Sequence, residues 1–285
     1  MEKLIILGHE NPDVDSIVSG YILEKILIKK GYFAEFIIPD KSINKDTLDI
    51  CNRNGLNPLN FMKNIDFEDK NVKYILVDHN QRDLAGEVVC IIDHHPANTQ
   101  IKTEHYYNKK ISSTACFICQ GNENLLDESS IKLAIIATLV DTASFHSTKG
   151  RAEDNAWAIG MCKKYNLDYN ELAKEGLTLT PLDNIAVASL NGLKKYNFNG
   201  KKVESSYIQV EISEYTEDKI RQIIHSLKQY ISNNKLTAFV FIVHDMKKFE
   251  TTYYLITENN IISKNYPRYT QRGDTIMPEV EKLLK

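Results

Sequence analysis

The sequence predicts an α/β protein, in which a parallel sheet flanked by helices forms an N-terminal domain and a second, smaller α/β domain follows. Short apolar runs alternate with stretches of helical spacing along the first half of the chain. Around 166–200 the composition shifts to polar residues, Gly and Pro, as in a linker, before strand and helix patterns resume. We therefore expect two domains, residues 1–185 and 186–285.

The N-terminal domain begins with a short apolar strand, 3–7. A helix starts near Ser16 and continues to Gly31, because apolar side chains recur there at helical spacing. Further strands are expected at the apolar runs 33–38, 73–77 and 88–92. The apolar stretch 131–140 has the length and Ala content of a buried helix. Short apolar strands separated by helices indicate a parallel sheet that is covered by helices on both faces.

The second domain is expected to mix strands and helices. The expected elements are strands at 207–212, 238–243 and 253–257, a helix at 216–233 and a short last helix at 279–284. In the N-terminal domain, Ser112-Ser113-Thr114 is typical of a helix N-cap, with hydrogen bonding to phosphate as the alternative.

Composition narrows the class of protein. The chain has 285 residues, with 35 Lys and Arg against 38 Asp and Glu, and it lacks the basic excess typical of nucleic-acid binding. The N-terminal apolar run stops at Gly8, too early for a signal peptide or a membrane span. The five Cys are odd in number and scattered. We expect a cytoplasmic protein with reduced thiols, and neither a nucleic-acid nor a membrane partner.

Residues with metal-binding chemistry follow the strands of the predicted sheet. They are His9, Asp13 and Asp15 after the first strand, Asp78 after the third, and Asp93, His94 and His95 after the fourth. Asp141 directly follows the predicted helix 131–140. Because ligands of such sheets lie at the carboxyl ends of the strands, we expect one pocket built from these separate loops.

Carboxylates and imidazoles crowded at one sheet edge repel or desolvate one another unless a cation lies between them. A divalent metal is the simplest such cation. The residues outnumber the ligands that one ion needs, so two metals that share a bridging carboxylate fit better. Mixed imidazole and carboxylate ligation is compatible with Mn, Co, Fe or Zn. The alternative role of Asp13 and Asp15 is to cap the helix that begins near Ser16.

Three segments resemble, in order, the motifs of the DHH phosphoesterase superfamily. They are 8–16, 77–80 and 92–95, which read Gly-His-Glu-Asn-Pro-Asp-Val-Asp-Ser, Val-Asp-His-Asn and Ile-Asp-His-His. The His-x-Asn-Pro-Asp-x-Asp form and the Asp-His-Asn element resemble the family II, manganese-dependent inorganic pyrophosphatases. Residues 139–145, Leu-Val-Asp-Thr-Ala-Ser-Phe, are similar to that family's fourth motif. The resemblance covers 1–165 and continues more weakly to the C-terminus.

The resemblance implies a dinuclear-metal phosphohydrolase that hydrolyses inorganic pyrophosphate to phosphate through a metal-bridging hydroxide. The implied cofactor is Mn²⁺, two ions per active site, with Co²⁺ as an alternative. The resemblance also implies an active site in the cleft between two α/β domains, a small phosphate-containing substrate, and a homodimer.

The resemblance assigns roles residue by residue. The implied metal ligands are His9, Asp13, Asp15, Asp78, His94 and Asp141. Asp78 is the implied bridge between the ions and is catalytic together with His95, which contacts substrate phosphate. Asp93 is expected to orient an imidazole without itself binding the metal.

The family's phosphate-binding segment in the second domain is altered in this chain. Counted back from Pro278, Arg272 matches the family's arginine, whereas Gly273 and Asp274 stand where the family has lysines. Losing two cations weakens the binding of a highly charged pyrophosphate. Short polyphosphate or a nucleotide-type compound is therefore the alternative substrate. A metal-dependent sensor or binding module with slow chemistry is a further alternative.

Other cations are candidates for contacting the substrate. Arg268, four positions before Arg272, can compensate in part. Lys201 and Lys202 both stand near the position of another phosphate-binding lysine of the family, and the sequence leaves open which of them matches.

Overall fold

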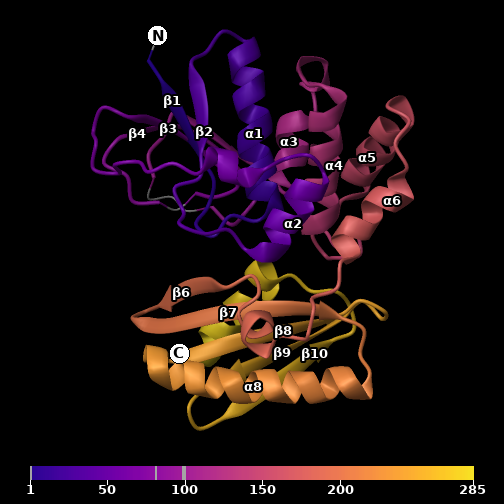
Figure 1. The fold of residues 1–285 in the computed structure, drawn as a ribbon. Helices are drawn as coiled ribbons and strands as arrows, with labels where there is room; N and C mark the ends of the chain where they lie inside the picture. The colour runs from indigo at the N-terminus through magenta and orange to yellow at the C-terminus, as the bar shows by residue number, and fades with distance from the viewer. Residues whose placement is uncertain (1, 81, 98–100) are drawn as a thin grey trace. The chain divides into compact units, whose positions relative to one another are not determined.

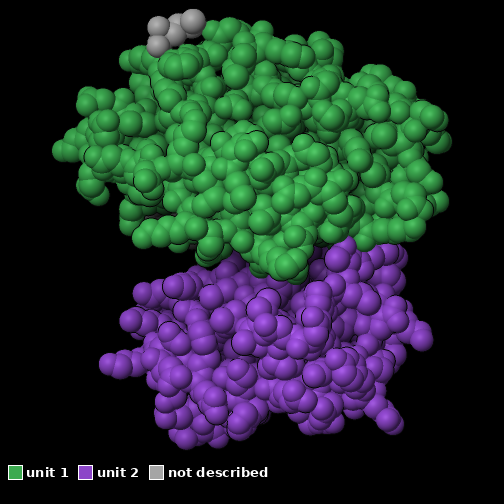
Figure 2. All heavy atoms as spheres, in the orientation of Figure 1, with its two compact units in different colours: residues 1–145, 149–176 green, residues 146–148, 177–285 purple. Residues whose placement is uncertain are grey.

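The computed structural model of the chain describes residues 2–80, 82–97 and 101–285. They form two compact units, shown in different colours in Figure 2. Unit 1 comprises residues 1–145 and 149–176, and unit 2 comprises residues 146–148 and 177–285. The division into folding domains at residue 185 stays a prediction.

Unit 1 contains a five-stranded parallel sheet with the strand order β2-β1-β3-β4-β5, which confirms the predicted fold class. The strands are β1 (Leu4–Leu7), β2 (Ala34–Ile37), β3 (Lys73–Val77), β4 (Glu87–Asp93) and β5 (His105–Asn108). Because β1 lies between β2 and β3, and β3 lies beside β4, the loops that leave β1, β3 and β4 emerge next to one another at the carboxyl edge of the sheet.

The helices of unit 1 lie on one side of this sheet (Figure 1). They are α1 (Val14–Lys29), α2 (Lys45–Arg53), α3 (Thr114–Cys119), α4 (Glu128–Asp141), α5 (Ala152–Lys164) and α6 (Tyr169–Ala173). The other face packs against loop side chains such as Ile65, Phe67 and Leu84. The expectation of helices on both faces is therefore wrong for the described part of the chain, because ordered loops cover the second face.

Helix α1 follows the loop that leaves the carboxyl end of β1. Its N-cap is Asp13, whose side chain accepts a hydrogen bond from the Ser16 N–H at 3.2 Å, and this satisfies one of the free donors of the first turn. Close packing follows along the helix, since a Cβ at Gly20 would come within 2.2 Å of the Phe36 ring of β2. The middle of α1 is thus packed closely against β2.

Unit 2 contains a second five-stranded sheet with the order β10-β9-β8-β7-β6. Its strands are β6 (Lys194–Phe198), β7 (Lys201–Val210), β8 (Ala238–Asp245), β9 (Glu250–Ile256) and β10 (Ile261–Tyr266), and its helices are α7 (Ile185–Ser189), α8 (Glu214–Asn234) and α9 (Met277–Leu283). The parallel pair β7 and β8 is connected by α8, and the other neighbouring pairs are antiparallel. Unit 2 is therefore a mixed α/β unit, as predicted.

The chain passes from unit 1 to unit 2 within the expected linker segment 166–200, between Gly176 and Leu177, but most of this segment is not coil. This segment contains α6, α7 and β6, because its Gly and Pro residues punctuate short elements instead of a continuous coil. Within the described ranges no helix has the length and apolarity that a membrane crossing requires.

Candidate metal centre

The predicted ligands from three strand ends come together around Asp78, which follows β3. The Nε2 atom of His9 lies 3.6 Å from Asp78 Oδ2, and the Nε2 atom of His94 lies 3.2 Å from Asp78 Oδ1. The two oxygens of one buried carboxylate thus face two different imidazoles. This is the arrangement that a carboxylate shared between two ions requires.

The first candidate group, called subsite A, consists of His9, Asp13 and Asp78. The Nε2 atom of His9 lies 3.2 Å from Asp13 Oδ2, while Asp13 Oδ1 caps α1. The capping alternative therefore applies to Asp13, but it occupies the other oxygen of that carboxylate. The backbone N–H of His9 donates to Ser16 Oγ at 3.0 Å, which ties the His9 loop to α1.

The second candidate group, called subsite B, consists of Asp15, His94 and Asp141. Asp15 lies inside α1 and is no cap; its two oxygens accept hydrogen bonds from the backbone N–H groups of Thr114 and Ala115 at 2.8 and 2.9 Å. These donors are the first turn of α3, whose N-cap is Ser113, as the sequence predicted. Asp141 ends α4 and places Oδ2 3.6 Å from the Nε2 atom of His94.

His95 and Asp93 lie beside these subsites. Asp93 is fully buried and accepts hydrogen bonds from the Nδ1 atom of His95 at 2.9 Å, from the backbone N–H of His94 at 2.8 Å and from Asn80. The Nδ1 atom of His95 also lies 3.7 Å from Asp78 Oδ1, and the side chain is 32% exposed. His95 is thus the accessible imidazole of the cluster, and its assignment to substrate phosphate stays a prediction.

Two orphaned nitrogen atoms fit a metal centre. The Nδ1 atoms of His9 and His94 are hydrogen-bonded to the backbone carbonyls of Glu10 and Ile111, at 2.8 and 3.1 Å. In that tautomer the Nε2 atom of each ring carries the lone pair. Both Nε2 atoms are buried and find no hydrogen-bond partner among the residues that the structure describes. A carbonyl behind the ring and a bare nitrogen facing carboxylates is the usual environment of a metal-binding histidine.

The electrostatics of the cluster point in the same direction. Burial raises the pKa of Asp78 to about 7, and the charge of Asp13 adds to this. Burial also raises the pKa of Asp15 well above its usual range, with a further contribution from Asp78 and Asp141. Carboxylates in such an environment hold their charge only when a cation lies among them. The donor set therefore fits divalent metal.

Lys149 is a further residue of this cluster, and it was not predicted from the sequence. Its ammonium Nζ lies 2.5 Å from Asp141 Oδ2, and its side chain is only 12% exposed. Opposite charge at Asp141 and Asp78 outweighs burial and keeps the pKa of Lys149 above its usual value. A single lysine in a loop has no periodicity that distinguishes it from a solvated one, so no sequence signal identified it.

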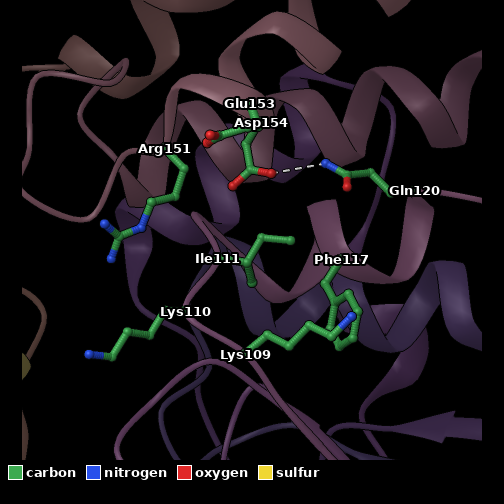
Figure 3. A pocket seen from close by; sticks show the side chains of 8 residues that line it. All are labelled: Lys109, Lys110, Ile111, Phe117, Gln120, Arg151, Glu153 and Asp154. Carbon is green, nitrogen blue, oxygen red and sulfur yellow. Dashed lines mark hydrogen bonds between the residues drawn. The ribbon is translucent and has the colours of Figure 1, made fainter.

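The segment 111–113, which leads into α3, contacts the metal-ligand cluster on one side and lines a separate cavity on the other. The carbonyl of Ile111 accepts from His94, while the Ile111 side chain lines a cavity of about 420 Å³ (Figure 3). Buried Asp154, also in that lining, accepts hydrogen bonds from the Ser112 N–H at 2.9 Å and from Gln120 at 3.0 Å. Asp154 therefore fixes the segment that orients His94 and Asp15.

The backbone next to the cluster adopts a conformation that side chains disfavour. Asp78 has a φ of 61°, and Ala143, Ser144 and Phe145 have φ values of 47°, 52° and 66°. Left-handed conformations of this kind cost about 1 kcal/mol or more per non-glycine residue. Hydrogen bonds from Ser144 N–H to the Leu139 carbonyl and from the Ser144 hydroxyl to the Ala173 carbonyl hold the 143–145 turn.

Of the four candidate substrate-binding cations of unit 2, two donate hydrogen bonds to backbone carbonyls and two are exposed. The guanidinium of Arg272 donates to the Gly192 carbonyl at 2.6 Å and lies 5.5 Å from the centre of the Tyr207 ring. Lys201 donates to the Leu284 carbonyl. Lys202 and Arg268 are exposed. Their assignment to substrate binding stays a prediction.

Comparison with known proteins shows which proteins the chain is similar to. Residues 3–142 match the family model described as DHH family, N-terminal domain. The chain is 26% identical over 272 residues to a manganese-dependent inorganic pyrophosphatase of Methanocaldococcus jannaschii, covering 85% of this chain and 83% of that protein. It is 25% identical over 264 residues to a manganese-dependent inorganic pyrophosphatase of Bacillus subtilis, covering 86% of this chain and 83% of that protein.

The fold comparison extends over the whole chain. A crystal structure from Methanococcus jannaschii, provisionally assigned to the family II inorganic pyrophosphatases, superposes with a TM-score of 0.73 and 21% sequence identity, and covers 98% of both chains. The two sheets described above are thus those of a known two-sheet α/β fold.

Proposed function

We propose, from the match of residues 3–142 to the DHH family model, that the protein is a dinuclear-metal phosphohydrolase that cleaves inorganic pyrophosphate to phosphate with Mn²⁺. The observation that carries this proposal is the position of Asp78, whose two oxygens face the His9 and His94 imidazoles at 3.6 and 3.2 Å. One carboxylate in contact with two ligand groups supports two neighbouring ions. Such a pair suits the in-line displacement of a phosphoryl group.

Different residues of the chain would hold the ions, orient an imidazole and bind the substrate phosphate. The groups that would hold the ions are His9, Asp13, Asp15, Asp78, His94 and Asp141. When bound, such ions supply positive charge and activate water for attack on phosphorus. Asp93 holds the ring of His95 through a 2.9 Å hydrogen bond, so that an accessible imidazole faces the substrate phosphate. Arg272 would contribute charge for a distal phosphate.

A second candidate substrate class is favoured by a specific observation. Gly273 and Asp274 directly follow Arg272, so that neutral and acidic residues stand where the sequence resemblance leads us to expect lysines. A weaker cationic clamp favours a phosphate compound other than pyrophosphate, such as short polyphosphate or a nucleotide. The metal centre is unaffected by this choice, because its residues all lie in unit 1. Cytoplasmic location and a homodimer also stay predictions.

The test is phosphate release by the metal-stripped full chain after addition of Mn²⁺, Co²⁺, Mg²⁺ or Zn²⁺. Pyrophosphate, tripolyphosphate and a nucleoside triphosphate are compared at equal concentration. Release from pyrophosphate with Mn²⁺ or Co²⁺, absent from the Asp78→Asn variant, supports the first proposal. Negligible release from pyrophosphate with rapid release from another substrate would replace it with the second. Metal binding without turnover of any substrate would contradict both and favour a binding module.

A further inference from the structure

We propose that Lys149 makes the two metal subsites unequal, so that subsite B binds its divalent ion more weakly than subsite A. This inference rests on the metal centre of the proposed function but concerns a residue to which neither the sequence motifs nor the family resemblance assigns a role. It predicts that the centre fills in two separate steps as the metal concentration rises.

The first support is the position of the Lys149 ammonium inside subsite B. Its Nζ atom lies 2.5 Å from Asp141 Oδ2, and that same oxygen lies 3.6 Å from the Nε2 atom of His94. The ammonium and a divalent ion would therefore contact the same carboxylate oxygen. The lysine also cannot diffuse away, because it is part of the chain.

The second support is burial. The side chains of Lys149 and Asp141 are 12% and 19% exposed, and those of Asp15 and His94 are 2% and 0% exposed. Water screens charges poorly in such surroundings, so a neighbouring ammonium strongly opposes the arrival of a second cation. The repulsion falls mainly on the ion that shares Asp141 with Lys149.

Subsite A is organised differently. Its two carboxylates, Asp13 and Asp78, lie 3.2 and 3.6 Å from the Nε2 atom of His9. Asp141, the carboxylate that the Lys149 ammonium contacts, is not part of subsite A. Subsite A is therefore expected to fill first. An anionic substrate would offset the Lys149 charge and so favour filling of subsite B.

The experiment measures Mn²⁺ binding to the metal-stripped full chain without any substrate, by counting free Mn²⁺ with electron paramagnetic resonance. For the wild type we expect two binding phases. In Lys149→Met, which keeps a long unbranched side chain without its charge, the weaker phase should tighten by at least about tenfold, because a full charge next to the ion is removed. The tighter phase should change little.

Two variants act as matched controls. Lys149→Arg keeps the positive charge and should retain two separated phases. Asp13→Asn removes a subsite A ligand and should weaken the tighter phase instead. Circular dichroism and thermal melting without metal establish that each variant is folded, and Lys149→Gln replaces Lys149→Met if the latter is not.

Several outcomes would overturn the inference. One is a single binding phase in the wild type, and another is a binding curve that Lys149→Met leaves unchanged. If that unchanged curve is accompanied by a raised KM for pyrophosphate, Lys149 is a substrate contact instead. Because the titration contains no substrate, a chain inactive on pyrophosphate can still show the two phases, so failure of the proposed function is distinguishable from failure of this inference.

Discussion

The predicted metal ligands of unit 1 and the predicted phosphate-binding cations of unit 2 differ in what holds them. In unit 1, parallel neighbours β1, β3 and β4 bring His9, Asp78 and His94 to one sheet edge, and backbone groups fix their orientation. In unit 2, Arg272 is held by the Gly192 carbonyl, whereas Arg268 is an exposed side chain. The sheet topology therefore determines the first set, and only local contacts determine the second.

This difference shows which sequence inferences transfer to a structure. The position of a short side chain just after a buried strand is restricted, because the register of the strand fixes the backbone that carries it. A long cation on an exposed loop keeps its rotamer freedom and reaches a ligand only when one is present. Substitutions in unit 1 should therefore affect metal and turnover together, and those in unit 2 should affect substrate affinity alone.

The largest effect is expected for Asp78→Asn. Loss of the shared charge removes a ligand from both sides of the cluster, so activity should fall at least about 100-fold and bound Mn²⁺ should decrease. Mass spectrometric metal analysis and phosphate release measure the two effects on the same sample. Full activity with unchanged metal content would show that Asp78 does not hold the ions.

A smaller effect is expected for Asp93→Asn, since Asp93 accepts hydrogen bonds from the His95 ring and from the backbone N–H of His94. The new amide NH₂ would face the NH₂ of Asn80, which now donates to Asp93. We expect a loss of about 10- to 100-fold in Mn²⁺ affinity or activity. The matched control is Asp245→Asn in unit 2, where the carboxylate also accepts backbone N–H groups after a strand. Equal metal loss in both variants would contradict the distinction between the units.

For Arg272→Gln we expect KM for the substrate to rise about tenfold, because a charge-assisted contact with phosphate is lost. Metal content and thermal stability of unit 1 should stay unchanged. Arg268→Gln, at an exposed position, should raise KM about threefold or less. A larger effect for Arg268 than for Arg272 would reverse the ranking of the two cations.

The smallest effect is expected for Gly273→Lys, which restores a cation to the altered segment. Nothing lies within 4 Å of the position that a Cβ would take, so the side chain fits. KM for pyrophosphate should fall about two- to fivefold, the range of an exposed charge contact. Gly273→Gln is the uncharged control, and an equal change in both variants would remove charge as the cause.

Much of unit 1 is predictable because its strands are apolar runs. The 73–77 run corresponds to β3 without a shift, and the 131–140 helix extends by a few residues to Glu128–Asp141. In contrast, β5 was missed because His105–Asn108 contains no apolar run and its side chains are largely exposed at the sheet edge. An apolar sequence pattern identifies a strand only when its side chains are buried, and the side chains of this edge strand are mostly exposed.

The same reasoning explains the limits at the site. The residues of the strand-end motifs were identified because strand order places them together. Lys149 and Asp154 were not, because their contacts with Asp141 and Ser112 depend on how the loop after α4 folds back over unit 1. No local pattern encodes such a contact.

The left-handed turn at 143–145 also bears on when the metal centre is completed. An isolated chain avoids this conformation by about 1–2 kcal/mol per residue, so the turn is not formed in advance. It becomes stable only after α4 is in place and the Ala173 carbonyl is near enough to accept from Ser144. Asp141 is the last residue of α4 and lies two residues before the turn, so we expect its final position to be set together with the turn. The nascent protein would therefore acquire its full set of ions after unit 1 has folded. The metal would then stabilise the folded unit and would not induce its folding.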